Sequence, residues 1–573
     1  MDYRKEYERW LASEALKPSE RQELAALDAA EAEDRFYRNL SFGTAGLRGV
    51  MALGPNRMNV YTVRLATEAF ARVLLRGSKK AAAKGVCLCY DCRDNSLRFA
   101  REAARVLVRN GFFVRMFVGM ASTPQLSFAV RRYGAAAGIN ITASHNTPEY
   151  NGYKAYNSYG SQIDNATADA VAAEMARLDP LSISSGLSFE NGLECGQIVL
   201  MGEADRQAFV KAELGCAIDR EVLRRGSDLR IVYTPLHGVG GEIIPYVLDG
   251  AGFRNIHYVR EQMRPDGAFP TAKSPNPEDP ASFALAVKLA REKGADLIIA
   301  NDPDADRIGI FAPDSKGALL PVSGNLTGAL LLNYIIEARR RCGSMPEKPA
   351  FIKTIVTGGL AACVAESAGV ACYETFTGFR FMAEKVRELE KRSEGNYLLA
   401  YEESFGYMMG NHVRDKDGVS AALLLAEMCA WYRGRGMTLW DGAEELFRRH
   451  GYFAERTSNM YFPGVSGQQE MRRIMEALRR FPPKEICGHA VERVRDYLSG
   501  VSRGLALGER QELPISGMDV LIYELSGGSR LAVRPSGTEP KVKLYALCRG
   551  ESRSGAEELA RAMERETEHI LRI

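Results

Sequence analysis

Three aspartates at alternating positions form a compact group of potential metal ligands. Asp302, Asp304 and Asp306 stand in Asn-Asp-Pro-Asp-Ala-Asp-Arg, directly after a strand-like apolar run. Carboxylates this close repel one another unless a cation lies among them, so the pattern predicts a site for a hard divalent ion such as Mg2+. An EF-hand is excluded, because its sixth position requires glycine where this chain has Arg307, and its twelfth requires glutamate where it has Pro313. A solvated acidic turn is the alternative, and the preceding strand and the tight spacing favour the metal site.

A second apolar run stops abruptly at a group of polar residues. The run before Thr142-Ala-Ser144-His145-Asn146 reads as a strand, and we expect its polar end to present a hydroxyl, an imidazole and an amide to solvent. Ser144 is either a turn residue or a nucleophile. A lone histidine beside a serine is often only a hydrogen-bonding partner within the loop, so His145 does not decide between the two.

A third polar loop, 534–541, reads Arg-Pro-Ser-Gly-Thr-Glu-Pro-Lys. Its arginine, two hydroxyls and glycine suit a phosphate, since a guanidinium binds two oxygens and glycine lets backbone N–H groups approach them. An ordinary Pro-Ser-Gly turn is equally compatible. The chain contains no Gly-Lys dipeptide, so it has no Walker loop and a nucleotide kinase is not expected. A dinucleotide fingerprint is weak, because Ile243 replaces its third glycine.

The composition is that of an ordinary globular protein. The 573 residues are 46% hydrophobic and 26% charged, and the net charge of +3 argues against nucleic-acid binding. We find no signal peptide and no apolar stretch of the roughly 18 residues that spanning a membrane requires. The 11 scattered cysteines suit a reducing cytoplasm. Cys87 and Cys89 alternate within a strand-like run, so buried strand cysteines are expected there rather than a zinc site.

The expected elements indicate an α/β protein. The first 40 residues look helical, and short apolar runs then alternate with amphipathic stretches. Strands are expected at 86–90, 112–117, 138–142, 229–233, 256–259, 295–300, 351–355 and 397–400. Three of them end in polar loops, which is where open α/β sheets bind ligands. The tail, with strands at 520–524, 530–533 and 542–548 and a last helix from 555, predicts a smaller α+β domain. The predicted boundaries give a helical extension at 1–40 and domains at 41–205, 206–318, 319–458 and 459–573.

Taken together, these segments resemble the α-D-phosphohexomutase superfamily of phosphoglucomutases, phosphomannomutases and their relatives. The resemblance covers residues 43 to about 550 and rests on five segments in the family's order: Gly43-Thr-Ala-Gly-Leu-Arg48-Gly49, Thr142–Asn146, Asp302–Arg307, Glu402-Glu403-Ser404-Phe405-Gly406 and Arg534–Thr538. It implies four domains around a central cleft, the first three with related α/β folds and mixed sheets. Thr147 departs from the proline that the family commonly has after this asparagine, which bears on the rigidity of the loop.

The resemblance also implies roles for individual residues. Ser144 is expected to carry a phosphoryl group and to bind Mg2+ together with Asp302, Asp304 and Asp306. The other expected catalytic residues are His145, Arg48 and Arg307. The expected substrate-binding residues are Thr377, Gly378, Glu402, Ser404, Lys416, Arg534, Ser536, Gly537 and Thr538.

The expected function is that of a phosphoglucomutase, which interconverts glucose 1-phosphate and glucose 6-phosphate through glucose 1,6-bisphosphate. The Glu402-Glu403-Ser404 loop favours the branch of bacterial α-phosphoglucomutases and phosphopentomutases. Phosphopentomutase, phosphomannomutase and a non-catalytic sugar-phosphate-binding relative are the alternatives. We expect a small-molecule sugar phosphate as partner, neither nucleic acid nor membrane, a cytoplasmic location, and a monomer or homodimer.

Overall fold

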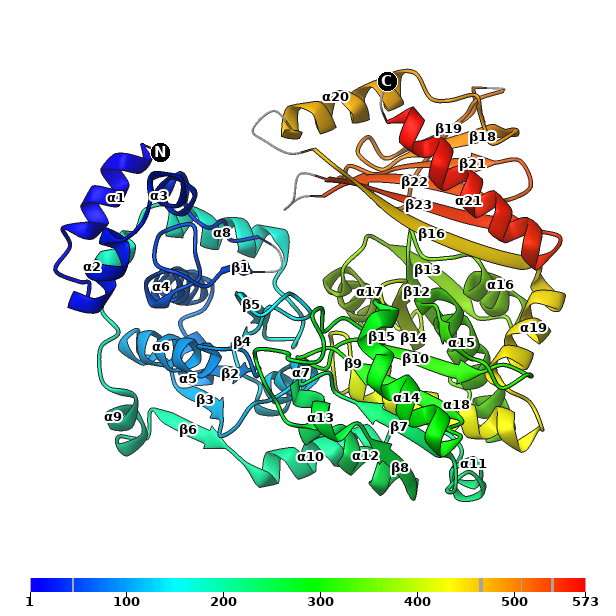
Figure 1. The fold of residues 1–573 in the computed structure, drawn as a ribbon, viewed down its shortest axis with the longest axis horizontal. Coiled ribbons are helices and arrows are strands. Elements are labelled where there is room, and N and C mark those ends of the chain that lie inside the picture. The colour runs from blue at the N-terminus through cyan, green and yellow to red at the C-terminus, as the bar shows by residue number, and fades with distance from the viewer. Residues whose placement is uncertain (1, 44–45, 463–466, 507, 537–540, 572–573) are drawn as a thin grey trace. The chain divides into compact units, whose positions relative to one another are not determined.

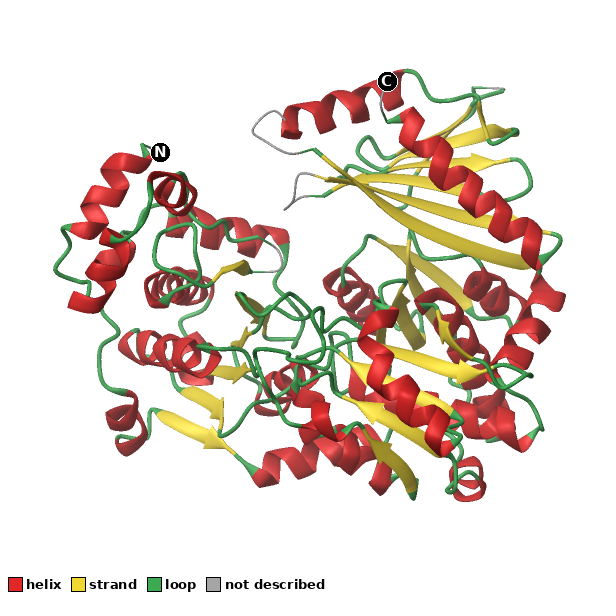
Figure 2. Cartoon of the chain, in the orientation of Figure 1, coloured by secondary structure: helices red, strands yellow, loops and turns green. Residues whose placement is uncertain are grey.

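Two units, each built from segments that are distant in the sequence, make up the chain. The computed structural model describes residues 2–43, 46–462, 467–506, 508–536 and 541–571. The first unit comprises Met1–Gly324 and Ser404–Thr438, and the second comprises Asn325–Glu403 and Leu439–Ile573. Strands alternate with helices through most of both units (Figure 2). Among the described residues, no helix combines the length and the apolar character that crossing a bilayer requires.

The N-terminal segment is helical, as the sequence predicts. Helices α1 (Tyr3–Leu11), α2 (Pro18–Ala25) and α3 (Ala29–Phe36) follow one another (Figure 1). Asp2 caps α1 by accepting hydrogen bonds from backbone N–H groups of its first turn. Trp10 is fully buried and lies edge-on to Phe36 and Tyr61, with ring centroids 5.8 and 5.5 Å away. The extension is therefore anchored in the core of the first α/β domain.

The first sheet has the strand order β1-β5-β4-β2-β3-β6. Its strands are β1 (Leu47–Val50), β2 (Val86–Tyr90), β3 (Val114–Phe117), β4 (Ala137–Ile141), β5 (Tyr150–Asn157) and β6 (Ile198–Met201). Its helices are α4 (Val60–Gly77), α5 (Ala81–Lys84), α6 (Ser96–Arg109), α7 (Thr123–Tyr133), α8 (Asn165–Met175), η1 (Pro180–Ser182) and α9 (Phe189–Glu194). Strands β4, β2, β3 and β6 are parallel, and β5 and β1 are added antiparallel.

Both faces of this sheet are covered, which explains the uninterrupted apolar sequence of β2. Val86 and Leu88 join the core formed with α4 and α6. Cys87 and Cys89 point to the other face, where they pack with residues of α7. All four side chains are fully buried, so these two cysteines are strand residues that share one face, as expected.

The second sheet lies in the same unit and has the order β11-β10-β9-β7-β8. Its strands are β7 (Arg230–Thr234), β8 (Asn255–Tyr258), β9 (Leu297–Asn301), β10 (Ile308–Pro313) and β11 (Leu319–Val322). Strands β8, β7 and β9 are parallel, and β10 and β11 are antiparallel. The helices are α10 (Glu203–Leu214), α11 (Arg220–Arg225), η2 (Val239–Glu242), α12 (Ile244–Gly250), α13 (Arg260–Met263), η3 (Pro280–Phe283) and α14 (Ala284–Lys293).

A later segment of the chain returns to this sheet. It contains α18 (Gly418–Gly434) and, before it, β15 (Gly406–Met408), whose Gly406 forms an isolated bridge with Arg307 beside β10. Helix α18 is apolar on nearly all sides and packs against α10, α11, α12 and strands β9 and β10. Residues 404–438 therefore belong to the first unit, although the sequence assigns 319–458 to a third domain. The domain boundaries themselves stay predictions.

The second unit begins with a parallel sheet in which β12 (Pro349–Thr354) lies between β13 (Ala371–Thr375) and β14 (Asn396–Glu402). Its helices are α15 (Gly324–Arg341), α16 (Leu360–Ser367), α17 (Phe379–Arg392) and α19 (Leu439–His450). Each of the two strands β12 and β13 leads through a short loop into a helix. The loop after β13 holds Thr377 and Gly378, which the sequence predicts to bind substrate.

The C-terminal sheet is antiparallel and has the order β16-β23-β22-β21-β18-β19-β20, with β17 paired to β18. Its strands are β16 (Tyr452–Tyr461), β17 (Glu485–Ile486), β18 (His489–Asp496), β19 (Val501–Gly504), β20 (Arg510–Glu512), β21 (Leu521–Leu525), β22 (Arg530–Pro535) and β23 (Lys541–Gly550). Helices α20 (Gly467–Arg480) and α21 (Arg553–Ile570) pack on one face. The other face joins Ile355 and Phe376, from the loops after β12 and β13, in one apolar cluster. The smaller α+β domain is confirmed.

Candidate active site

Ser144 lies in the loop that follows β4. Its hydroxyl donates a hydrogen bond of 2.8 Å to Asp302 Oδ2, and its backbone N–H donates to Thr142 Oγ1 at 2.9 Å. The backbone of Ser144 is left-handed, with φ of +52°, which costs a residue with a side chain roughly 1–3 kcal/mol. Ser144 is buried and His145 only half-buried, which corrects the expectation of a solvent-exposed serine. The aspartate loop after β9 covers the hydroxyl, and the sequence shows no sign of this contact.

A single buried arginine holds the backbone of this loop. The guanidinium of Arg93 donates to the carbonyl oxygens of Ser144 (2.6 Å), Asn146 (2.5 Å), Thr147 (2.8 Å) and Tyr150 (3.1 Å). These four bonds fix the course of the loop on both sides of the serine. Such charge-assisted bonds are stronger than those between neutral groups.

Arg93 is itself held from two sides. Its Nε lies 3.3 Å from Asp91 Oδ2 in an ion pair, and both side chains are fully buried. Its guanidinium lies over the ring of Phe269, 5.0 Å from the centroid. Because Phe269 belongs to the second sheet's part of the chain and Asp91 to the first, Arg93 links both halves of the first unit to the serine loop.

The three predicted metal ligands form a tight buried turn. Asp302, Asp304 and Asp306 are at most 1% exposed, and one oxygen from each lies within 4.8 Å of the others. Asp302 Oδ1 accepts the backbone N–H groups of Asp306 and Arg307 at 3.1 and 3.0 Å. Ala305 completes the turn with φ of +52°. The turn therefore gathers the carboxylates instead of exposing them to solvent.

Two oxygens of this turn are suited to a cation. Asp304 Oδ1 and Asp306 Oδ1 are buried and have no hydrogen-bond partner in the part of the chain that the structure describes. Leaving a buried charged oxygen without a partner costs several kcal/mol. A hard divalent ion with oxygen ligands would satisfy both atoms, so the residues present fit a divalent-cation site.

Two buried lysines compensate part of the negative charge. Lys154 Nζ lies 2.7 Å from Asp304 Oδ2 and 3.3 Å from Asp306 Oδ2, and Lys416 Nζ lies 3.0 Å from Asp306 Oδ2. Burial raises the pKa of Asp304 and Asp306, but the lysines outweigh it and hold the pKa of both below its ordinary value. Burial and the neighbouring carboxylates leave the pKa of Asp302 raised.

The loop that carries Lys416 approaches the aspartate turn very closely. Gly418 N–H donates to the carbonyl oxygen of Ala305 at 3.2 Å. A Cβ at Gly418 would lie 2.5 Å from Asn301 Nδ2 and 2.7 Å from that carbonyl oxygen, so only glycine fits. On the other side of the loop, Asp415 Oδ2 accepts from the hydroxyl of Tyr156 at 2.9 Å.

Two arginines, Arg48 and Arg307, add positive charge around Ser144, and the imidazole of His145 lies beside its hydroxyl. His145 Nδ1 lies 3.4 Å from Ser144 Oγ, and Arg48 donates to Asn146 Oδ1 at 2.9 Å. Burial and the charges of Arg307 and Arg48 lower the pKa of His145 well below its ordinary value. Although solvent reaches Arg48, desolvation by the surrounding atoms and the charge of Arg307 lower its pKa as well. Arg307 pairs with Glu278 at 2.5 Å. An anion placed here would relieve the repulsion between these cations.

The second unit holds the remaining predicted residues near the ends of its strands. Gly378 caps α17 with φ of +113°, and Thr377 before it is half-buried. Glu402 is buried at the end of β14, and the next residue, Glu403, accepts from the hydroxyls of Thr354 and Thr357 at 3.3 Å each. Burial and the charge of Glu402 raise the pKa of Glu403. Ser404 is half-buried and is the first residue of the segment that belongs to the other unit.

The predicted phosphate loop joins β22 to β23. Arg534 is half-buried near the end of β22, and Ser536 N–H donates to the carbonyl oxygen of Lys541 at 2.8 Å. Burial and the charge of Glu403 raise the pKa of Tyr545, whereas the charge of Arg534 lowers it. The phosphate loop and the Glu402–Glu403 loop are therefore neighbours within the second unit. Gly537 and Thr538 lie outside the described residues.

Comparison with known proteins now identifies the family. Models of the phosphoglucomutase/phosphomannomutase family match four successive parts of the chain: α/β/α domain I at residues 39–181, α/β/α domain II at 207–316, α/β/α domain III at 323–450 and the C-terminal domain at 492–566. The chain belongs to this family. The four-domain α/β fold and the resemblance read from the sequence are confirmed.

Relatives in the phosphoglucomutase/phosphomannomutase family match the chain over most of its length. Phosphoglucomutases of Staphylococcus haemolyticus and Staphylococcus epidermidis are 36% and 35% identical to it, over 90% of this chain and 91% and 92% of their own. The open form of the phosphoglucomutase parafusin from Paramecium has a TM-score of 0.68 at 18% identity, covering 94% of this chain and 95% of its own. A family protein from Burkholderia thailandensis has a TM-score of 0.65 at 18% identity, covering 92% and 97%. At these identities the solved structures support the fold.

Two residues of this site, Arg93 and Lys154, were not predicted from the sequence. Lys154 carried a signal, because a lysine between Tyr153 and Ala155 in a strand buried on both faces needs a charged partner. Arg93 carried none, since the backbone carbonyls that it binds are more than 50 residues further along the chain.

Proposed function

We propose that this chain is a phosphoglucomutase, which interconverts glucose 1-phosphate and glucose 6-phosphate. The observation that carries the proposal is the placement of the Ser144 hydroxyl, 2.8 Å from a carboxylate of a buried aspartate triad. The curated relatives at 35–36% identity that bear this name support the choice of sugar. Family membership alone would leave mannose phosphates equally open.

Mg2+ is the proposed resident cation. Asp302, Asp304 and Asp306 would hold it together with an oxygen on Ser144, in keeping with the two carboxylate oxygens that lack a partner in the described structure. When bound, it would neutralise negative charge on a phosphoryl group attached to the serine. An all-oxygen donor set favours Mg2+ over softer metals.

Ser144 is the proposed carrier of the phosphoryl group. In one half-reaction the bond between phosphorus and Ser144 Oγ breaks as a bond to a sugar hydroxyl forms, and in the other the reverse occurs. The attacking hydroxyl loses a proton and the departing oxygen gains one. His145, with Nδ1 3.4 Å from Oγ and a lowered pKa, is positioned to hold that proton. Arg48 and Arg307 supply positive charge for the oxygens of the group in transfer.

The remaining predicted residues are proposed to bind the sugar and the phosphate that does not react. Glu402 and Ser404 would bind ring hydroxyls, Thr377 and Gly378 would line the sugar, and Lys416 would contact the substrate from beside the triad. Arg534 and Ser536, with Gly537 and Thr538, would hold the second phosphate. Glucose 1,6-bisphosphate is the proposed intermediate, and added bisphosphate would serve as activator by phosphorylating Ser144.

A parallel assay tests the substrate. We would supply Mg2+ and glucose 1,6-bisphosphate and compare kcat/KM for glucose 1-phosphate, mannose 1-phosphate and ribose 1-phosphate. We expect glucose 1-phosphate to exceed the others by more than about tenfold, which corresponds to about 1.4 kcal/mol in the transition state. A preference for ribose or mannose 1-phosphate would replace the proposed activity by a phosphopentomutase or a phosphomannomutase.

A serine variant tests the carrier. Ser144→Ala should lose turnover and the phosphoryl group that mass spectrometry detects on the wild-type chain, while its thermal unfolding stays cooperative. Ser158→Ala, which removes an exposed hydroxyl 14 residues further on, is the matched control and should keep both properties. Turnover at the wild-type rate in Ser144→Ala would exclude the assignment.

A further inference from the structure

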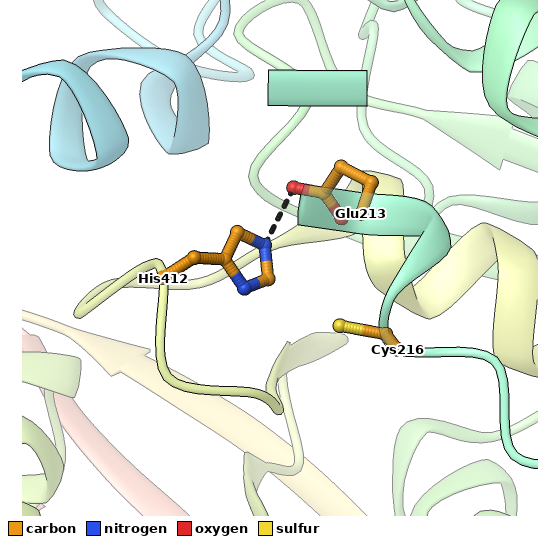
Figure 3. A group of neighbouring side chains, drawn as sticks. All are labelled: Glu213, Cys216 and His412. Atoms are coloured by element: carbon orange, nitrogen blue, oxygen red, sulfur yellow. Dashed lines mark hydrogen bonds and ion pairs between the residues drawn. The ribbon is translucent and has the colours of Figure 1, made fainter. Parts of the chain in front are cut away.

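A second group of ligand-type side chains lies in the first unit, and the proposed mutase reaction does not use it. Glu213 is in the last turn of α10, Cys216 follows two residues after that helix ends, and His412 precedes α18 by six residues. The three side chains converge on one point from these two segments (Figure 3). One donor atom from each, an oxygen, a sulfur and a nitrogen, lies within 4.8 Å of the others.

The packing around the group brings the donor atoms close together. His412 Nε2 lies 2.9 Å from Glu213 Oε1. A Cβ at Gly410 would lie 2.9 Å from both Cys216 Sγ and His412 Nδ1, and the positive φ of +71° also favours glycine. Phe128 and Phe209 lie edge-on or tilted to the imidazole, with centroids 6.3 Å away. The rings shield the group, in which the imidazole of His412 is half-buried.

The group contains more acidic than basic side chains. Glu213 is fully buried, and its Oε2 has no hydrogen-bond partner among the described residues. Asp417, also fully buried, places Oδ2 3.5 Å from His412 Nε2. Two buried carboxylates thus share a single imidazole, and a metal ion would supply the missing charge.

We propose that Glu213, Cys216 and His412 bind a transition-metal ion of the Zn2+ type. Thiolate, imidazole and carboxylate are the ligands of four-coordinate zinc, whereas the aspartate triad offers oxygen alone. Small side-chain rotations would bring the three donors to about 2.0–2.3 Å from one ion, and Asp417 Oδ2 or a water would take the fourth position. The ion would fasten the end of α10 to the segment before α18, four residues before Lys416.

Cobalt spectroscopy separates this site from the triad. Purified wild-type chain, stripped with a chelator and kept in excess Mg2+, is titrated with Co2+. We expect thiolate-to-cobalt charge-transfer absorption and the visible bands of tetrahedral Co2+, saturating at one equivalent and abolished by Zn2+. Oxygen ligands at the triad cannot produce the thiolate absorption. Absence of this absorption in the wild-type chain would overturn the proposal whether or not the chain turns over sugar phosphates.

Variants assign the absorption to its ligands. Cys216→Ser should lose it, and His412→Gln should weaken Co2+ binding by more than about tenfold, the loss seen even for supporting residues of metal sites. Cys363→Ser removes another half-buried cysteine, from the second unit, and should keep the absorption. Zinc content measured by mass spectrometry on chain purified without chelator should fall in Cys216→Ser and not in Cys363→Ser. Absorption that survives in Cys216→Ser would overturn the assignment.

Discussion

Two buried groups of carboxylates in the first unit differ in how their charge is balanced. At Asp302, Asp304 and Asp306 two lysines contact the oxygens, and only two oxygens remain without a partner in the described structure. At Glu213 and Asp417 a single imidazole lies between the carboxylates. The first group arises from five consecutive residues and the second from segments about 200 residues apart. The difference shows that a buried group of charges can be predicted from a sequence only where its own members are local, since the lysines that balance the triad are distant in the sequence as well.

Removing a carboxylate from the triad should have the largest effect. Asp306→Asn removes the negative charge of a carboxylate that has one oxygen without a protein hydrogen-bond partner in the described structure and that also pairs with Lys416. We expect kcat to fall by roughly 10³-fold, equivalent to about 4 kcal/mol of lost charge stabilisation. Steady-state kinetics across a Mg2+ titration would measure it, with the exposed Asp169→Asn as control. A variant that reaches the wild-type kcat at high Mg2+ would show that Asp306 contributes affinity alone.

Removing Lys154 tests whether the lysine and the proposed metal ion neutralise the negative charge of the same carboxylates. Lys154→Met leaves Asp304 and Asp306 without their shared cation, and breaking such a buried pair costs about 3–5 kcal/mol. Mg2+ should restore part of the loss, because an ion bound only by the folded chain stabilises it. Denaturant unfolding with and without Mg2+ would measure both effects, and the exposed Lys84→Met is the control. An equal loss in both conditions would mean that the two cations act on different atoms.

The contrast between local and distant partners also decides what the sequence could predict. The strand at 86–90 was predicted with its observed bounds, because its apolar run is continuous and bounded by glycine and polar residues. The aspartate turn and the serine loop were identified as candidate site segments, since each is one short segment after a buried strand. The burial of Ser144 was predicted wrongly, because the aspartate turn that covers it is 158 residues away.

Other contacts of the first unit left no local pattern. Helix α18 is apolar on nearly all sides, but nothing in its sequence shows that it packs on the second sheet. Arg93 resembles any other arginine in a polar loop, and its four carbonyl partners cannot be seen before the chain is folded. The Glu213 and His412 pair is hidden in the same way. Such contacts depend on tertiary packing, which periodicity and motif spacing do not encode.

Substituting Arg93 tests whether a residue that is distant from Ser144 in the sequence acts by positioning the serine loop. Arg93→Lys keeps the charge but cannot reach four carbonyl oxygens with a rigid fork of donors. We expect kcat to fall by about 100-fold through misplacement of the serine, with KM little changed. The control is Arg98→Lys, on the half-exposed face of α6. A rise in KM at constant kcat would mean that Arg93 acts on substrate binding instead of on the serine loop.

The smallest expected effect belongs to Glu455 in β16. Burial alone raises the pKa of its carboxyl to about 7. The unfolded carboxyl ionises near its ordinary value of 4.5, while the folded one keeps its proton until about pH 7. Because the folded state binds more protons in this window, stability should fall as pH rises from about 4.5 to 7 and then level off.

Glu455→Gln removes this titration, so comparing the variant with the wild-type chain separates the contribution of Glu455 from that of the aspartate triad. Above pH 7 the variant should be more stable than the wild-type chain by about 1–3 kcal/mol, and the gap should narrow towards pH 4.5. Urea unfolding of both chains across that range measures the gap, and Glu190→Gln, at an exposed position, should show no such trend. A gap that stays constant with pH would mean that Glu455 is balanced by a positive charge, as the triad is, and that burial alone does not distinguish compensated from uncompensated carboxylates.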